Sequence, residues 1–233
     1  MNLFDKNNRV LVVAAHPDDE VLGCGGTISK MRAGNVPVTI VILGEGITSR
    51  KNIPVEKQKE LLEALHEDAR KAGAILGVED VRLFNLPDNR FDQVPLLEIV
   101  HVLEGVIQDI KPTVVFTQHG GDLNVDHVQT FRATMTATRP MAGTSVRTLL
   151  SYEVASSTEW AFQQFSPAFH PSVFVDIDGF VDSKINAMTA YESEKRQPPH
   201  PRAEESLRAA AVYWGKAASM MAAEPFHLVR ALA

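Results

Sequence analysis

The feature that most constrains the fold is a regular alternation of apolar, strand-like runs with helix-like segments. The run VLVVAA at residues 10–15 is continuous and rich in β-branched side chains, which is typical of a strand buried on both faces. The run VPVTIVIL at residues 36–43 has the same character. Two further strands and four helices complete the predicted series, with strands at 81–85 and 113–117 and helices at 27–35, 55–72, 96–110 and 127–138. This alternation predicts an α/β fold, with a Rossmann-like, mostly parallel sheet and helices on both faces.

The last third of the chain is less regular. Strands are predicted at residues 148–154 and 172–177, and helices at 183–191 and 204–221. No internal repeat or long linker marks a second domain. We therefore expect residues 1–233 to form a single domain, in which a core of about residues 8–140 is completed by residues 141–233. The second part is expected to complete the sheet and to wall a substrate cleft.

Composition excludes several classes of protein. With 23 Lys and Arg against 29 Asp and Glu, the chain has no general attraction for nucleic acid or for an anionic membrane. The single cysteine, Cys24, rules out an internal disulfide framework and any multi-cysteine metal site, and it suits a reducing compartment. No apolar run reaches the roughly 18 residues of a spanning helix, and the N-terminus has no signal-like apolar region. We expect a cytoplasmic protein without a membrane span.

A dense polar cluster, HPDDE, follows the first predicted strand. Ligands of open parallel sheets bind at the carboxyl ends of the strands, so the cluster lies where chemistry is expected. Burying His16, Asp18, Asp19 and Glu20 together is costly unless a cation or many hydrogen bonds compensate the like charges. Imidazole with carboxylate suits zinc, which typically takes three protein ligands at a catalytic site. The alternative is a solvated turn that begins a helix.

A second polar cluster, HGGDLNVDH at residues 119–127, follows the strand predicted to end at Thr117 and opens onto the same edge of the sheet. Either His119 or His127 can supply a third ligand. A dinucleotide-binding turn at Gly23 is a competing interpretation, but its glycine spacing requires Gly where Ile28 stands. The glycines more plausibly allow a helix to approach the sheet closely.

The two clusters together closely resemble the motifs of the LmbE-like (PIG-L) family of N-acetylglucosaminyl deacetylases. The matching residues are Ala15 to Glu20 after the first strand, Gly25 and Gly26 beyond it, and Asp126 with His127 after a later strand. The resemblance implies one Zn²⁺ ion per chain, held by His16, Asp19 and His127, and it implies that Asp18 is the general base.

The second motif departs from the family at one position. The family usually carries H-x-D-H, whereas this chain has Asn124-Val125-Asp126-His127. Asn124 can donate a hydrogen bond to an oxyanion but cannot supply a proton, so the acid role shifts to Asp18 or His119. Asp126 is expected to orient a ligand or the base, or else to cap the following helix.

Several loop side chains are candidates for binding substrate. They are Arg50, Arg139, His119, His200 and Arg202. Arg50 follows the second strand and can bind a phosphate or sugar hydroxyls with two hydrogen bonds. Arg139, His200 and Arg202 suit a nucleotide or phosphate group, although each also fits a purely structural role.

The sequence therefore predicts a zinc-dependent hydrolase that removes the N-acetyl group from an N-acetylated sugar, sugar nucleotide or other sugar conjugate. Acetate and a free amino sugar are the expected products, and a homo-oligomer is compatible with the sequence. A non-haem iron enzyme shares the set of two histidines and one carboxylate and stays open as an alternative. A non-catalytic protein that binds a metal or a sugar nucleotide is the third possibility.

Overall fold

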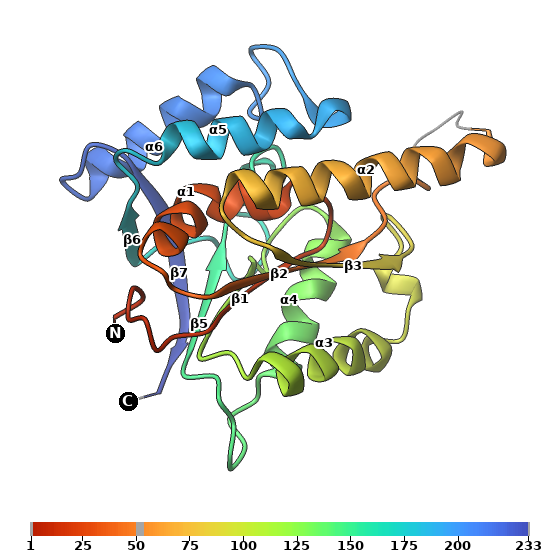
Figure 1. Cartoon of the computed structure of the whole chain (residues 1–233), viewed down its shortest axis with the longest axis horizontal. Coiled ribbons are helices and arrows are strands. Elements are labelled where there is room, and N and C mark those ends of the chain that lie inside the picture. Colours follow the sequence, from red (N-terminus) through yellow and green to blue (C-terminus); the bar gives the residue numbers. More distant parts are fainter. Residues whose placement is uncertain (1, 50–53, 233) are drawn as a thin grey trace.

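A seven-stranded sheet runs through the centre of the molecule in the order β3-β2-β1-β4-β5-β7-β6. The computed structural model describes residues 2–49 and 54–232 (Figure 1). The strands are β1 (Val10–Ala14), β2 (Val38–Gly44), β3 (Asp80–Leu86), β4 (Val114–Gln118), β5 (Thr148–Tyr152), β6 (Val173–Asp176) and β7 (Ala223–Ala231). The first five strands pair in parallel, whereas β7 is antiparallel to both of its neighbours.

Helices cover both faces of the sheet, as the alternating pattern predicts. They are α1 (Asp19–Ala33), α2 (Val55–Ile75), α3 (Leu96–Ile110), α4 (Val125–Ala137), α5 (Val181–Ala190) and α6 (Glu204–Ala217). Three single-turn 3₁₀ helices are η1 (Phe91–Gln93), η2 (Glu159–Ala161) and η3 (Glu192–Glu194). Helices α3 and α4 lie together on one face, and α1, α2 and α5 pack together on the other (Figure 1).

Strand β1 shows why a continuous apolar run is needed at the centre of such a sheet. Successive side chains of a strand point to opposite faces. Val10, Val12 and Ala14 belong to the core on the α1, α2 and α5 side. Leu11 and Val13 belong to the core on the α3 and α4 side. Both faces are covered, so every position of the strand must be apolar.

Helix α1 begins at Asp19, earlier than the predicted start at residue 27, and it contains the glycines of the first motif. A Cβ atom on Gly23 would lie 2.1 Å from the Tyr152 ring, and one on Gly26 would lie 2.8 Å from Ile177. The glycines therefore allow close packing of α1. They lie within the helix, which excludes the dinucleotide-binding turn.

Strand β7 is absent from the sequence-based prediction. It inserts between β5 and β6, and it carries Glu224 and Pro225, which are residues unusual inside a sheet. The buried Glu224 carboxylate accepts hydrogen bonds from the backbone of Gly26 and Thr27 in α1 and from Lys184 Nζ in α5. Since these partners come from other parts of the chain, the local pattern does not indicate a strand.

The order of the strands places the polar clusters together. From β1 the chain moves to β2 and β3 on one side, and β4 then pairs with β1 on the other side. The carboxyl ends of β1 and β4 therefore flank the switch point of the sheet, where open α/β folds form their ligand crevice. Within the described part of the chain, no helix has the length and apolar character needed to span a bilayer.

Candidate metal and catalytic site

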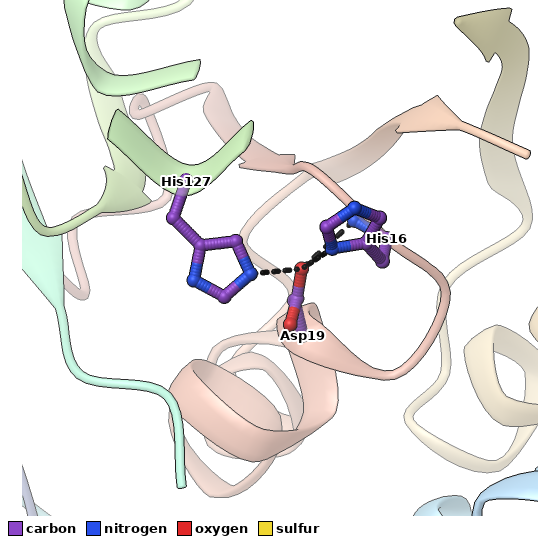
Figure 2. Close-up of side chains that lie close together, drawn as sticks. All are labelled: His16, Asp19 and His127. Carbon is purple, nitrogen blue, oxygen red and sulfur yellow. Dashed lines mark hydrogen bonds and ion pairs between the residues drawn. The ribbon is translucent and has the colours of Figure 1, made fainter. Parts of the chain in front are cut away.

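Three side chains converge at the switch point. His16 lies in the loop after β1, Asp19 is the first residue of α1, and His127 lies in the first turn of α4. His16 Nδ1 and His127 Nε2 each lie 3.4 Å from the same atom, Asp19 Oδ2. Figure 2 shows the Asp19 carboxylate between the two imidazole rings. One ligand atom from each residue lies within 4.8 Å of the others, which is an arrangement suited to a single metal ion.

The far nitrogen of each histidine faces another carboxylate. His16 Nε2 lies 2.9 Å from Asp126 Oδ2, and His127 Nδ1 lies 3.1 Å from Asp122 Oδ1. A carboxylate accepts a hydrogen bond from a protonated far nitrogen, and this tautomer leaves the near nitrogen with a lone pair for a metal. The two rings are thus oriented in the same way by two different aspartates.

Each orienting aspartate is itself held in place. Asp126 accepts hydrogen bonds from the backbone N–H of Asn89 at 2.6 Å and of Phe91 at 2.9 Å. Asp122 accepts from the hydroxyls of Ser157 and Thr158. Asp122 is not among the site residues predicted from the sequence, although it lies in the HGGDLNVDH cluster. Its partners follow some 35 residues later in the chain and could not be paired with it beforehand.

The pocket stabilises positive charge. Burial disfavours the charged form of both histidines, but Asp126 and Asp19 raise the pKa of His16 to about 10. In the same way, burial is outweighed by Asp19 and Asp122, which raise the pKa of His127 to about 9. Asp19 Oδ1 is buried and has no hydrogen-bond partner among residues 2–49 and 54–232. The two near nitrogens face Asp19 Oδ2, and the other oxygen of the same carboxylate is the unpaired one. Together with the negative environment, this donor set fits a divalent cation.

Asp18 lies beside this group without belonging to it. Its backbone is left-handed, with φ at 105°, at the residue that precedes α1. The side chain is buried and accepts a hydrogen bond from Arg202 Nη1 at 2.7 Å. Burial raises the pKa of Asp18 well above its ordinary value, although the Arg202 guanidinium opposes the shift. A carboxyl group of this kind can hold a proton and release it.

A cleft of about 330 Å³ opens over these residues. The loop after β1 lines it with His16 and Asp18, and the start of α1 lines it with Asp19. The walls come from the loops before η1 and α4, from Ser156 and Ser157 after β5, and from the segment between α5 and α6. The last third of the chain thus contributes to the same cleft as the first strand.

The sequence left two roles open for Asp126, either to orient a ligand or the base or to cap α4, and in the structure Asn124 makes the capping contact. Asn124 Oδ1 accepts the capping hydrogen bond from the Asp126 backbone N–H at 2.8 Å. The Asp126 carboxylate instead contacts His16. Asn124 also lines the cleft, and its amide nitrogen donates to Asn89 Oδ1 at 3.3 Å.

Of the four predicted substrate-binding residues that the structure describes, Arg202 lines the cleft. His119 is buried between Ser151 Oγ and the Pro167 carbonyl oxygen, so it neither joins the metal ligands nor reaches the cleft. Arg50, which the sequence also predicts to bind substrate, lies outside the described residues.

The remaining two do not line this cleft. Arg139 follows the last turn of α4, at the end of the helix opposite His127, and pairs with Glu104 at 2.9 Å. His200 packs edge-on against Trp160, with ring centroids 5.7 Å apart, and accepts a hydrogen bond from the Arg202 backbone N–H. Neither residue therefore lies among the side chains that line the cleft.

Comparisons with known proteins identify a family and relatives that this chain resembles. The sequence profile of the family described as "PIG-L: GlcNAc-PI de-N-acetylase" matches residues 11–138. The "Probable N-acetyl-alpha-D-glucosaminyl L-malate deacetylase 2" of Bacillus anthracis is 28% identical over 193 residues, which cover 81% of this chain and 83% of that protein. The "Diacetylchitobiose deacetylase" of Thermococcus kodakarensis is 26% identical over 239 residues, which cover 97% of this chain and 85% of that protein.

A solved structure shares the fold with a different reaction. The 4-carboxy-2-hydroxymuconate hydratase of Pseudomonas putida KT2440 superposes with a TM-score of 0.77 at 20% identity, covering 97% of this chain and 98% of that chain. This likeness shows the fold alone. The fold alone therefore does not distinguish a hydrolase from a hydratase.

Proposed function

This chain belongs to the PIG-L (LmbE-like) family, and we propose that it is a zinc-dependent hydrolase that removes the N-acetyl group from an N-acetylated sugar or sugar conjugate. One observation carries the proposal. The Asp19 carboxylate lies between two imidazoles whose far nitrogens face carboxylates, and a second buried aspartate, Asp18, stands beside it in the same cleft. The names of the relatives supply the substrate class, because they are deacetylases of amino-sugar compounds.

His16, Asp19 and His127 would hold one Zn²⁺ ion per chain. Two imidazoles and one carboxylate form a ligand set that zinc accepts and that leaves a coordination position open. Zinc bound there would acidify a water molecule and polarise the acyl carbonyl group. Asp126 and Asp122 would keep the two imidazoles in the orientation that binding requires.

Asp18 would move the proton. It takes one proton from the attacking water while the water oxygen bonds to the amide carbonyl carbon, and the carbonyl oxygen gains the negative charge. When the carbon–nitrogen bond breaks, Asp18 returns that proton to the nitrogen, so the products are a free amine and acetic acid. Asn124 lines the cleft, and its amide nitrogen, which donates one hydrogen bond to Asn89 Oδ1, has a second N–H that can donate to the charged oxygen.

The whole chain is proposed to act as one catalytic domain. Ser156, Glu194 and Arg202 come from the last third of the sequence and line the same cleft as His16. Residues 141–233 therefore supply walls that the core of about residues 8–140 lacks. Arg50 stays a predicted contact to a phosphate or sugar hydroxyl.

Metal analysis combined with a substrate screen tests the proposal. The purified protein is assayed for bound metal and for release of amine and acetate from N-acetyl sugars and sugar nucleotides. Stoichiometric zinc with equal amounts of amine and acetate is the expected result. Bound iron with oxygen consumption would support the non-haem iron alternative, and addition of water without acetate release would indicate a hydratase.

Replacing the proposed base separates catalysis from metal binding. Asp18→Asn should retain zinc and lose nearly all amine release, because an amide cannot accept the proton of water. Asp92→Asn is a matched control, since this aspartate is exposed on η1. Undiminished activity of Asp18→Asn would show that the base is assigned wrongly. A protein that holds zinc but turns over no substrate would favour the non-catalytic binding role.

A further inference from the structure

Arg202 connects the segment between α5 and α6 to the catalytic cleft. Its Nη1 atom donates a hydrogen bond to Asp18 Oδ2 at 2.7 Å, across 184 positions of sequence. The Arg202 side chain is 20% exposed and that of Asp18 is 2% exposed, so the pair is largely shielded from water. A contact this buried is less weakened by solvent than a surface ion pair.

Arg202 is itself held from a second direction. Its Nε atom donates to Ser156 Oγ at 2.8 Å and to the Ala155 carbonyl oxygen at 3.3 Å. Glu194 Oε2 lies 3.6 Å from Nη1 on the other side. Because a guanidinium group is planar and its donors have fixed directions, these contacts define where Nη1 points. The guanidinium is therefore a fixed support for the Asp18 carboxylate.

Asp18 needs such a support. The residue stands in a left-handed backbone conformation between the loop and α1, and its backbone N–H is taken by Glu20 Oε2 at 3.2 Å. Within the part of the chain that the structure describes, the hydrogen bond to the Asp18 carboxylate comes from Arg202. A base must keep its oxygen within reach of both the attacking water and the leaving nitrogen, and a displacement of about 1 Å can cost a factor of about 100 in rate.

Other polar groups near the cleft are engaged elsewhere. The Arg196 guanidinium donates to the backbone of Ser193 and Lys195 and pairs with Glu194 at 3.2 Å. Asn124 caps α4 with its side-chain oxygen. The geometry thus singles out Arg202 as the group that fixes Asp18.

We propose that Arg202 is a positioning residue for Asp18, so that the last third of the chain completes the catalytic site built by the first strand. The inference rests on the proposed role of Asp18 as general base. It assigns to Arg202 a function other than binding a nucleotide or phosphate group of the substrate.

Kinetics of Arg202 variants test the proposal. Arg202→Ala should lower kcat by about 100-fold while KM changes little and the bound zinc is retained. Added guanidinium ion should restore part of the lost kcat, and Arg202→Lys should be less active than the wild type, because a lysine ammonium lacks the fork that contacts Asp18 and Ser156 together. Arg208→Ala is the matched control, since Arg208 is a partly exposed arginine of α6 paired with Asp182.

Two results with these variants would overturn the inference. A raised KM with unchanged kcat would mean that Arg202 binds the substrate and does not position the base. A loss of zinc or of thermal stability that accounts for the lower activity, without rescue by guanidinium, would mean that its role is structural.

A crystal structure of Arg202→Ala gives a result that does not depend on activity. The Asp18 carboxylate should leave its wild-type position by more than about 0.5 Å, the tolerance for a preorganised group. An Asp18 side chain that keeps its place would refute the positioning role. If the wild-type enzyme released no amine from any sugar, the proposed function would fail, and this structural comparison would still decide whether Arg202 fixes Asp18.

Discussion

Asp126 and Asp122 make parallel contacts to two different histidines of the proposed metal site, which leads to a quantitative prediction. Each carboxylate lies against the far nitrogen of one histidine, at 2.9 Å for His16 and 3.1 Å for His127. Replacing such a partner typically lowers metal affinity by about 10- to 100-fold, which corresponds to about 1.4 to 2.8 kcal/mol. We expect Asp126→Asn and Asp122→Asn each to weaken zinc binding by this factor.

The double variant adds a sharper test. The two aspartates contact different histidines and, within residues 2–49 and 54–232, share no hydrogen-bond donor. Their free-energy effects should therefore add approximately, and Asp126→Asn with Asp122→Asn should lose about 100- to 10,000-fold in affinity. A double variant no weaker than either single variant would contradict independent orientation of the two rings.

The assay is a competition for zinc between the protein and a chelating dye, with thermal unfolding of the metal-free proteins as a control for folding. Asparagine keeps the shape of aspartate and one carbonyl oxygen that can accept from the backbone of Asn89 or Phe91. The metal-free variants should consequently remain folded. Zinc affinity within twofold of the wild type for both single variants would refute the reasoning that carboxylates orient the ligands.

Two further predictions concern stability. Gly23→Ala should destabilise the protein by about 1 to 3 kcal/mol, because the new methyl group would lie 2.1 Å from the Tyr152 ring. In Gly105→Ala the new methyl group on α3 meets no atom within 4 Å, so this variant should instead stabilise the protein by about 0.5 to 1 kcal/mol. Thermal unfolding compares the two variants. A Gly23→Ala protein as stable as the wild type would contradict the close packing of α1. Burial raises the pKa of Glu153 to about 7 against a hydrogen bond from Trp214, so the folded state binds more protons than the unfolded state between about pH 4.5 and 7. The free energy of unfolding should therefore fall as pH rises through this window, by up to about 1.4 kcal/mol per pH unit. Glu153→Gln should remove that part of the pH dependence. Denaturant titrations at several pH values measure it, and an unchanged pH dependence in the variant would contradict the role of Glu153.

The fold class and the chemical character of the site can be predicted from the sequence alone. Runs such as residues 10–15 are apolar at every position because both faces of their strand are covered. This requirement is visible in the short stretch of sequence that forms the strand. His16 and Asp19 follow such a strand directly, so their place at the edge of the sheet follows from the strand itself. The resemblance to the family then selected His127 over His119, and in the structure His127 Nε2 lies 3.4 Å from Asp19 Oδ2.

The contacts that join distant parts of the chain cannot be predicted in this way and are seen in the folded structure. The hydrogen bond from Arg202 to Asp18, the support of Asp122 by Ser157 and the insertion of β7 between β5 and β6 connect segments that no local pattern relates. These contacts depend on strand order and on how each loop packs over the sheet. A residue's type and spacing encode which chemistry it offers and which face it occupies, whereas the partner it meets is set by the packing of the whole domain.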